Sequence, residues 1–368
     1  MKRHIIYITS IAVILLQSVL PSCREIYRHE PNIAEDVIVV DGLLSDRPGP
    51  HLIRLTGIQM IETSDPDNPH SPVNEGIPDY IRGASVIVAD DAGNQFIFNE
   101  ESPGHYYSDS TLRAVEGRSY SLHIITSNGH VYLSSPQQLP GPVTLDTLIA
   151  MNTYRERLML STQGTYFNER VHGLEIVANI RGSGKNRPLF RLVPQYLLLY
   201  TQTFANHQNF HWKKLYMPDN ININMEAYEK VSATVRNHEV TFMSLREQDL
   251  YIDREDDFNP HRRILLLSLF SLNEESWNFY SSAHEQIHSE GRLFDPMAKQ
   301  LPSNIYCDSD PGRLALGLFE VSRVTKRTFV VVETPWEDFY PLKETEDLHH
   351  IPDFGKTFID PPGFWVDR

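Results

Sequence analysis

Apolar and polar positions alternate in short runs over most of the chain between residues 37 and 135. The polar turn sequences Asp91–Asn94 and Ser127–Gly129 each separate two runs rich in β-branched and aromatic residues, and each predicts a β-hairpin. About six or seven short strands at this spacing are typical of a β-sandwich of roughly 100 residues. We therefore expect residues 37–140 to form an N-terminal β-sandwich.

A proline-rich joint at residues 136–143 predicts a domain boundary. Strand-like runs continue beyond it and predict a second β-rich domain over 141–368, which ends in a polar tail. One segment changes its period to that of a helix, with Glu274 and Glu275 in its first turn and Gly291 at its end. The pattern predicts one amphipathic helix over about 274–290, in a fold that is otherwise mainly β.

The first residues have the pattern of a secretory signal peptide. Met1–Arg3 is basic, and the apolar run over residues 5–20 is shorter than the roughly 20 residues that a membrane span needs. A plain N-terminal anchor helix is the alternative. The ending Leu20–Cys23 resembles a bacterial lipobox, in which the peptidase cuts before the cysteine and the thiol carries diacylglycerol. This resemblance implies a signal peptide over 1–22, lipidation of Cys23, and a tether over 23–36.

Composition narrows the class of protein. The chain has 368 residues, with 40% hydrophobic and 22% charged, as in soluble globular proteins. Its net charge of −15 and the absence of a basic run exclude a typical nucleic-acid binder. The chain has 2 cysteines, and lipidation of Cys23 leaves Cys307 alone, so no disulfide framework forms within it. We expect Cys307 to be a small buried residue.

The sharpest candidate for chemistry is the motif His284-Glu285-Gln286-Ile287-His288 on the predicted helix. Histidines four residues apart share a helix face, and the intervening Glu285 could serve as a general base on a zinc-bound water. However, Phe294 occupies the position where the extended motif has its third ligand. We therefore expect an amphipathic helix with surface histidines, no metal and no cofactor. A surface hydrolase that uses His284, Glu285 and His288 remains the alternative.

Aromatic residues are dense between residues 196 and 216 and include Tyr196, Tyr200 and Trp212. Aromatic side chains in strands mostly pack in the core or against each other across strands. If these three were exposed together, they would form a platform for a glycan or peptide. A glycan- or peptide-binding surface protein is thus a further alternative.

Two segments carry a resemblance to a known family: VVDGLLSDRPGPHLIRL at 39–55 and LGLFEVS at 316–322. With the lipobox-like Cys23, they make the chain similar to the "domain of unknown function 4249" family of Bacteroidota lipoproteins. The resemblance implies an immunoglobulin-like or carboxypeptidase-regulatory-like N-terminal sandwich followed by a second β-rich domain. It implies no catalytic residues, and family genes commonly lie beside those of TonB-dependent receptors. The cysteine-rich tail of many members is absent.

These observations together favour a non-enzymatic outer-membrane lipoprotein. We expect it to be held by its lipid and to be an accessory partner of a TonB-dependent receptor in uptake or envelope assembly. An extracellular ligand is a further expected partner, and nucleic acid is not. The sequence leaves open which face of the outer membrane carries the protein.

Overall fold

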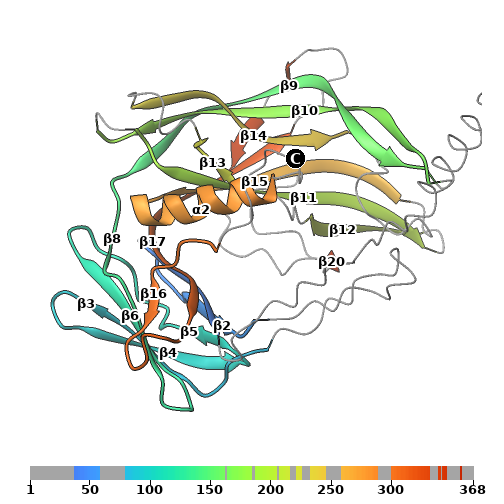
Figure 1. Cartoon of the computed structure of the whole chain (residues 1–368). Coiled ribbons are helices and arrows are strands. Elements are labelled where there is room, and N and C mark those ends of the chain that lie inside the picture. Colours follow the sequence, from blue (N-terminus) through green and yellow to red (C-terminus); the bar gives the residue numbers. More distant parts are fainter. Residues whose placement is uncertain are drawn as a thin grey trace, which may run out of the picture. The chain divides into compact units, whose positions relative to one another are not determined.

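The structure is a computed structural model. It describes residues 37–58, 79–161, 164–184, 187–204, 207–215, 221–225, 233–245, 258–288, 300–331, 339–340, 342–345 and 357–358. In these ranges the chain is mainly β, with one helix, as the sequence predicts (Figure 1). None of the helical segments described is long and apolar enough to cross a membrane.

The first group of strands forms a sandwich in which both predicted hairpins are present. Strand β3 pairs with β4, and β6 pairs with β7, each antiparallel. The order along the sheet is β16-β7-β6-β3-β4-β5-β2-β1-β17. The strands are β1 (Ile38–Ser45), β2 (Leu52–Thr56), β3 (Ser85–Asp90), β4 (Gln95–Ser102), β5 (His105–Tyr107), β6 (Ser119–Ile125), β7 (Val131–Ser134), β8 (Gln137–Gln138), β16 (Ile305–Cys307) and β17 (Ala315–Val331).

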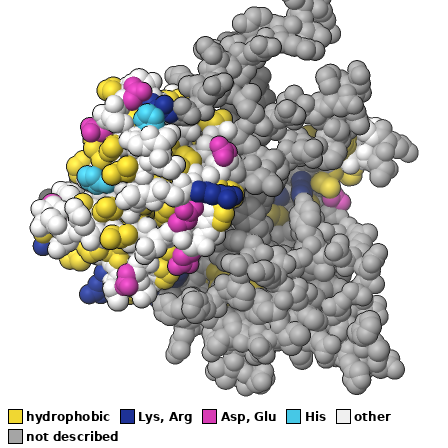
Figure 2. Space-filling view, turned by 90° about the horizontal axis from the view of Figure 1, so that it is seen from below, with side chains coloured by type: hydrophobic (Ala, Val, Ile, Leu, Met, Phe, Trp, Pro, Cys, Tyr) yellow, Lys and Arg dark blue, Asp and Glu magenta, His cyan; other side chains and the backbone are white. Residues whose placement is uncertain are grey.

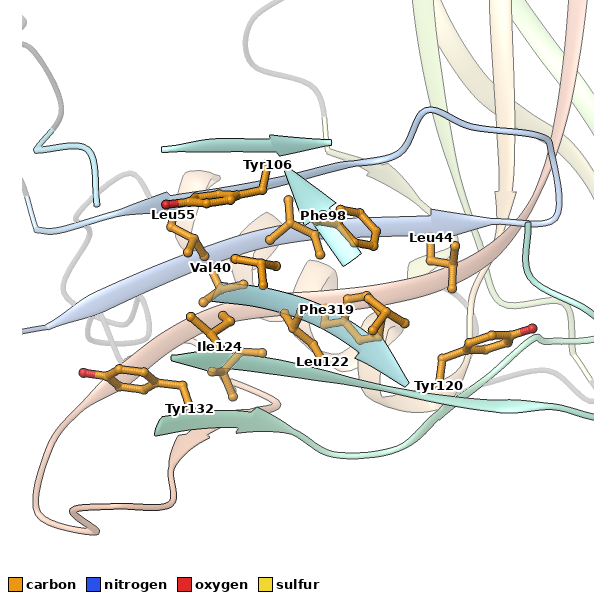
Figure 3. Packing of buried hydrophobic residues seen from close by; sticks show 14 of the residues in the cluster. Val40, Leu44, Leu55, Phe98, Tyr106, Tyr120, Leu122, Ile124, Tyr132 and Phe319 are labelled. Carbon is orange, nitrogen blue, oxygen red and sulfur yellow. The ribbon is translucent and has the colours of Figure 1, made fainter. Parts of the chain in front are cut away.

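Alternating side chains of these strands fill the first core. In β6, Tyr120, Leu122 and Ile124 are buried while the residues between them are not, which is the period of two read from the sequence. Figure 3 shows Leu122 and Ile124 packed in the same group of side chains as Val40 and Phe319. The same cluster also contains Ile305, Cys307, Ala315 and Val321. Residues from late in the chain therefore complete the core of the N-terminal sandwich.

The second group of strands forms two facing sheets. One continues from β17 in the order β15-β11-β12-β20, and the other has the order β14-β10-β9-β18. Their shared core includes Leu174 and Ile176 on one side and Leu265 and Leu267 on the other. The strands are β9 (Val143–Leu160), β10 (Tyr166–Gly182), β11 (Phe190–Phe204), β12 (His207–Leu215), β13 (Asn222–Ile223), β14 (Thr234–Ser244), β15 (Phe258–Ser271), β18 (Phe339–Tyr340), β19 (Leu342–Thr345) and β20 (Thr357–Phe358).

The predicted helix is confirmed as α2 (Glu274–Ile287). Asn273 caps its N-terminus, because the Asn273 side chain accepts a hydrogen bond from the backbone N–H of Ser276. Trp277 is buried and packs with Phe270 and Val324 in a third hydrophobic cluster. The helix therefore lies against strands β15 and β17 (Figure 1).

Strand β17 takes part in both groups of strands. Residues 315–322 pair in parallel with β1, and residues 323–331 pair antiparallel with β15. The predicted division of the chain near residue 140 stays a prediction. The pairing of β1 with β17, and of β7 with β16, shows that the first sandwich draws on both sides of that point.

Candidate functional site

A cluster of buried charges lies where β17 changes partners. The side chain of Glu320 on β17 is 1% exposed, and its carboxylate lies 3.2 Å from the guanidinium of Arg191 on β11. The hydroxyl of Tyr280 on α2 donates to the same carboxylate at 2.7 Å, and the Ser322 hydroxyl donates to its other oxygen. One carboxylate thus connects α2, β11 and β17.

Aromatic rings enclose the cation of this cluster. The guanidinium carbon of Arg191 lies 3.8 Å from the centre of the Phe270 ring and 4.8 Å from that of Tyr280. Burial by itself would lower the pKa of Arg191, but the Glu320 carboxylate reverses this and the pKa is raised. Burial raises the pKa of Tyr280 well above its ordinary value. The phenol therefore stays neutral and the guanidinium charged at physiological pH, an arrangement suited to fixing the strands rather than to moving protons.

A second polar cluster joins the start of α2 to the first sandwich. Gln137 on β8 is 1% exposed, and its amide donates to the Glu275 carboxylate at 2.5 Å. Its carbonyl accepts from the side chain of Asn273 at 2.6 Å. Ser135 also donates to Glu275, at 2.8 Å. The side chains that begin the helix are therefore held by the strand before the predicted domain boundary.

The histidines of the candidate zinc motif stack on each other on α2. The ring centres of His284 and His288 are 4.0 Å apart. Nδ1 of His284 lies 2.9 Å from the backbone oxygen of Ile221, and Nδ1 of His288 lies 2.8 Å from that of His284. Among the described residues, no group of three His, Cys, Asp or Glu is placed to hold a metal. Phe294 lies outside the described residues, and the absence of zinc stays a prediction.

Of the three aromatic candidates for a binding platform, the structure describes the side chain of Tyr196 alone. Tyr196 is 6% exposed, and its hydroxyl donates to Thr241 at 3.0 Å inside the second core. Including Tyr196 in an exposed platform is therefore wrong, because its ring packs between two sheets. Tyr200 and Trp212 lie on the paired strands β11 and β12. Their side chains are outside the described part of the chain, so a binding role for these two residues stays a prediction.

The two cysteines have different outcomes. Cys23 lies outside the described residues, and its lipidation stays a prediction. Cys307 is confirmed as a small buried residue of the first core, with its sulfur 3.5 Å from the Ser309 hydroxyl. Cys307 is therefore packed in the first core as a structural residue would be.

Two open pockets lie on the first sandwich. One of about 690 Å³ is lined by residues of β16 and its flanking segments, including Tyr306 and Leu314. The other, of about 590 Å³, lies between the start of β4 and the segment from Asp109 to Arg118. Figure 2 views the molecule from below and shows hydrophobic, acidic and basic side chains interspersed over the described part of the face seen there. Neither pocket is lined by histidine, so neither offers the usual side chain for general acid–base catalysis at neutral pH.

The Arg191–Glu320 pair is not among the residues predicted from the sequence. A signal for it was present, because Glu320 is the one charged residue in the apolar run of residues 314–321. A lone charge in a strand buried on both faces needs a partner, since an unpaired buried carboxylate is costly. The partner itself could not be read, because 129 residues separate Arg191 from Glu320.

Comparison with known families agrees with the resemblance seen in the sequence. A family described as "Domain of unknown function (DUF4249)" matches residues 25–328. The match covers most of the chain, so the protein belongs to this family. Searches of curated proteins and of solved structures give no match.

Proposed function

We propose that this protein is a lipid-anchored, non-enzymatic component of the outer membrane and an accessory partner of a TonB-dependent receptor. The observation that carries the proposal is the ending Leu20–Cys23 after a short apolar run and a basic start. Lipoprotein processing at Cys23 supplies more than one acyl chain, and about two such signals are needed for stable anchoring.

The start of the family match supports this reading. The match begins at residue 25, two residues after Cys23, so it lies within the chain that cleavage before Cys23 would leave. The described body begins at residue 37. A tether over residues 24–36 could span up to about 45 Å if fully extended, at roughly 3.5 Å per residue. A body on such a tether can reach a partner embedded in the same membrane.

The non-enzymatic part of the proposal is supported by the contacts of two buried polar side chains. The carboxylate of Glu320 is occupied by Arg191, Tyr280 and Ser322, and Gln137 is occupied by Asn273 and Glu275. A catalytic group has to reach substrate, whereas these groups are enclosed by the fold. The receptor link has a separate basis, which is the family resemblance.

The experiment compares two cysteine variants in cells labelled with palmitate. Cys23→Ala should abolish labelling, because it removes the acceptor thiol. The variant should also leave the membrane fraction, because it has no lipid anchor. Cys307→Ala is the matched control and should keep full labelling, because Cys307 is buried in the first core. If Cys23→Ala still labels and fractionates like the wild type, the lipoprotein proposal fails.

A further inference from the structure

Large apolar side chains are exposed together at the end of the β9–β10 hairpin that lies away from the second core. Leu158 is 65% exposed and Leu160 54% on β9, and on β10 Tyr166 is 67% exposed and Phe167 47%. Tyr154, further back on β9, is 54% exposed. Single exposed apolar residues are ordinary, but a contiguous set marks an interaction surface.

Four of these side chains lie on one face of the hairpin. Leu160 pairs directly with Tyr166, so their side chains lie on the same face of the hairpin. Leu158 and Tyr154 precede Leu160 by two and six residues on β9, and these even spacings place them on that face too. We call Tyr154, Leu158, Leu160 and Tyr166 the ribbon face. On β10 the same parity continues to Leu174, which is 0% exposed in the second core. The ribbon face is therefore the core-facing side of the sheet, extended beyond the strands that cover it.

The outer edges of this part of the hairpin lack described partners. Strand β18 pairs with β9 only at Ala150 and Met151, and β14 pairs with β10 over residues 173–181, with one more hydrogen bond to His172. Beyond these points, the strands that the structure describes add no pairing. A two-stranded ribbon is only marginally stable in water, so an exposed apolar one gains stability from a binding partner.

A cation borders the apolar surface. The guanidinium carbon of Arg170 lies 4.3 Å from the centre of the Tyr154 ring, and the His172 ring stacks on the same tyrosine at 4.8 Å. Arg170 faces Glu156 across the hairpin. A fixed guanidinium beside an apolar strip suits a partner that offers a carboxylate next to apolar side chains.

We propose that the ribbon face is the docking surface for a β-structured protein partner that presents an apolar strand surface, a free strand edge and a carboxylate. The inference rests on the proposed function, with the receptor as that partner. A strand edge can pair with the backbone groups along the ribbon, as in recognition by strand addition. The interior of a bilayer cannot pair with those groups, and the polar turn between Ser161 and Thr165 would enter it first.

The test uses the tagged full chain in its native membranes. The variant Leu158→Ser with Tyr166→Ser removes the centre of the ribbon face, and Ile97→Ser on β4 is the control, because Ile97 is 64% exposed on the first sandwich. The membranes are solubilised in detergent, the tagged protein is purified through its tag, and the TonB-dependent receptor that co-purifies with it is quantified. We expect the double variant to lower the yield of receptor about tenfold, which corresponds to about 1.4 kcal/mol, and the control to leave it unchanged.

A photo-reactive amino acid at position 166 then identifies what contacts the ribbon face. A cross-link to the receptor supports the proposal, and a cross-link only to lipid or to a second copy of the chain overturns it. Equal receptor yield from the wild type and the double variant would overturn the docking surface while leaving the proposed function intact. If the wild type recovers no receptor, the proposed function fails and the inference fails with it. Urea unfolding midpoints equal to the wild type confirm that the variants fold.

Discussion

Arg191 and Glu320 form an ion pair across a strand that separates them. Arg191 lies on β11 and Glu320 on β17, and β15 runs between these strands in the sheet. Phe270 of β15 supplies the ring on which the Arg191 guanidinium rests. The pair therefore fixes three strands at the point where β17 passes from one sandwich to the other.

Removing one partner of this pair should lower the free energy of unfolding much more than replacing both partners. Glu320→Ala leaves the Arg191 guanidinium buried without its carboxylate and should lower the free energy of unfolding by about 3–5 kcal/mol. The double variant Arg191→Met with Glu320→Leu should recover a large part of that loss, because no charge is left unpaired. Urea unfolding of the single and double variants measures both values. Additive losses from the two sites would show that the charges are not coupled.

Gly317 should tolerate no side chain, because it approaches β1 too closely. Its φ is +105°, and a Cβ atom at this position would clash with the backbone oxygen of Val40. Gly317→Ala should therefore push β17 away from β1 and lower the free energy of unfolding by more than about 4 kcal/mol. Gly93→Ala is the control: its φ is +86°, but a Cβ there meets nothing within 4 Å.

Thermal and urea unfolding compare these two glycine variants. The control should lose only about 1–2 kcal/mol, which is the cost of the left-handed backbone for a residue with a side chain. Equal losses at positions 317 and 93 would contradict the close parallel pairing of β1 with β17.

His51 should make the protein less stable below neutral pH. It is 7% exposed, its Nε2 lies 3.0 Å from the backbone oxygen of Leu112, and burial lowers its pKa below the ordinary value of about 6.5. Protons therefore bind the unfolded chain more readily than the folded one. The contribution of His51 to the free energy of unfolding is fully present above about pH 6.5. It is lost as the pH falls from there toward the lower pKa of the folded state, by at most about 1.4 kcal/mol per pH unit.

The measurement is the urea midpoint at pH 7.5 and at pH 5.5 for the wild type and for His51→Gln. The wild type should lose more stability than the variant between the two values, because glutamine does not titrate. The same loss in both proteins would assign the pH dependence to other groups.

A chain that ends at residue 140 tests the division into domains. The sequence pattern predicts that residues 37–140 fold alone, whereas the first core also contains Ile305, Ala315 and Phe319. From the structure we expect a fragment over 37–140 to give poorly dispersed amide spectra. Addition of a peptide over residues 300–331 should improve the dispersion, because it supplies β16 and β17. Well-dispersed spectra from the fragment alone would support the boundary read from the sequence.

Local signals in the sequence were sufficient to predict individual hairpins and the helix, but not to predict which distant strands pair. The turn at Asp91–Asn94 and the acidic first turn with Glu274 and Glu275 each act within a few residues, and the structure has the hairpin and the helix at these places. The parallel pairing of β1 with β17 joins Ile38 to Ala315, and no local pattern encodes such a partner. The carboxylate of Glu320 stood out in its apolar run, but its partner could be found only in the fold.

The same difference between local and long-range information explains which candidate residues could be predicted from the sequence. Cys307 was predicted to be buried because small apolar side chains without reactive neighbours pack in cores. The structure confirms that it is buried. Tyr196 could not be separated from an exposed aromatic by sequence, because strand aromatics occur on both faces of a sheet. Its burial depends on the opposing sheet, which includes Met243 and Val240 of β14.

The mass of the mature N-terminal peptide tests the central claim most directly. The protein is purified from membranes in detergent and digested, and its N-terminal peptide is analysed by mass spectrometry. The account predicts a chain that begins at Cys23 and carries diacylglycerol on the sulfur of that residue. A chain that retains Met1, or one in which Cys23 is unmodified, would contradict the lipid anchor and with it the proposed function.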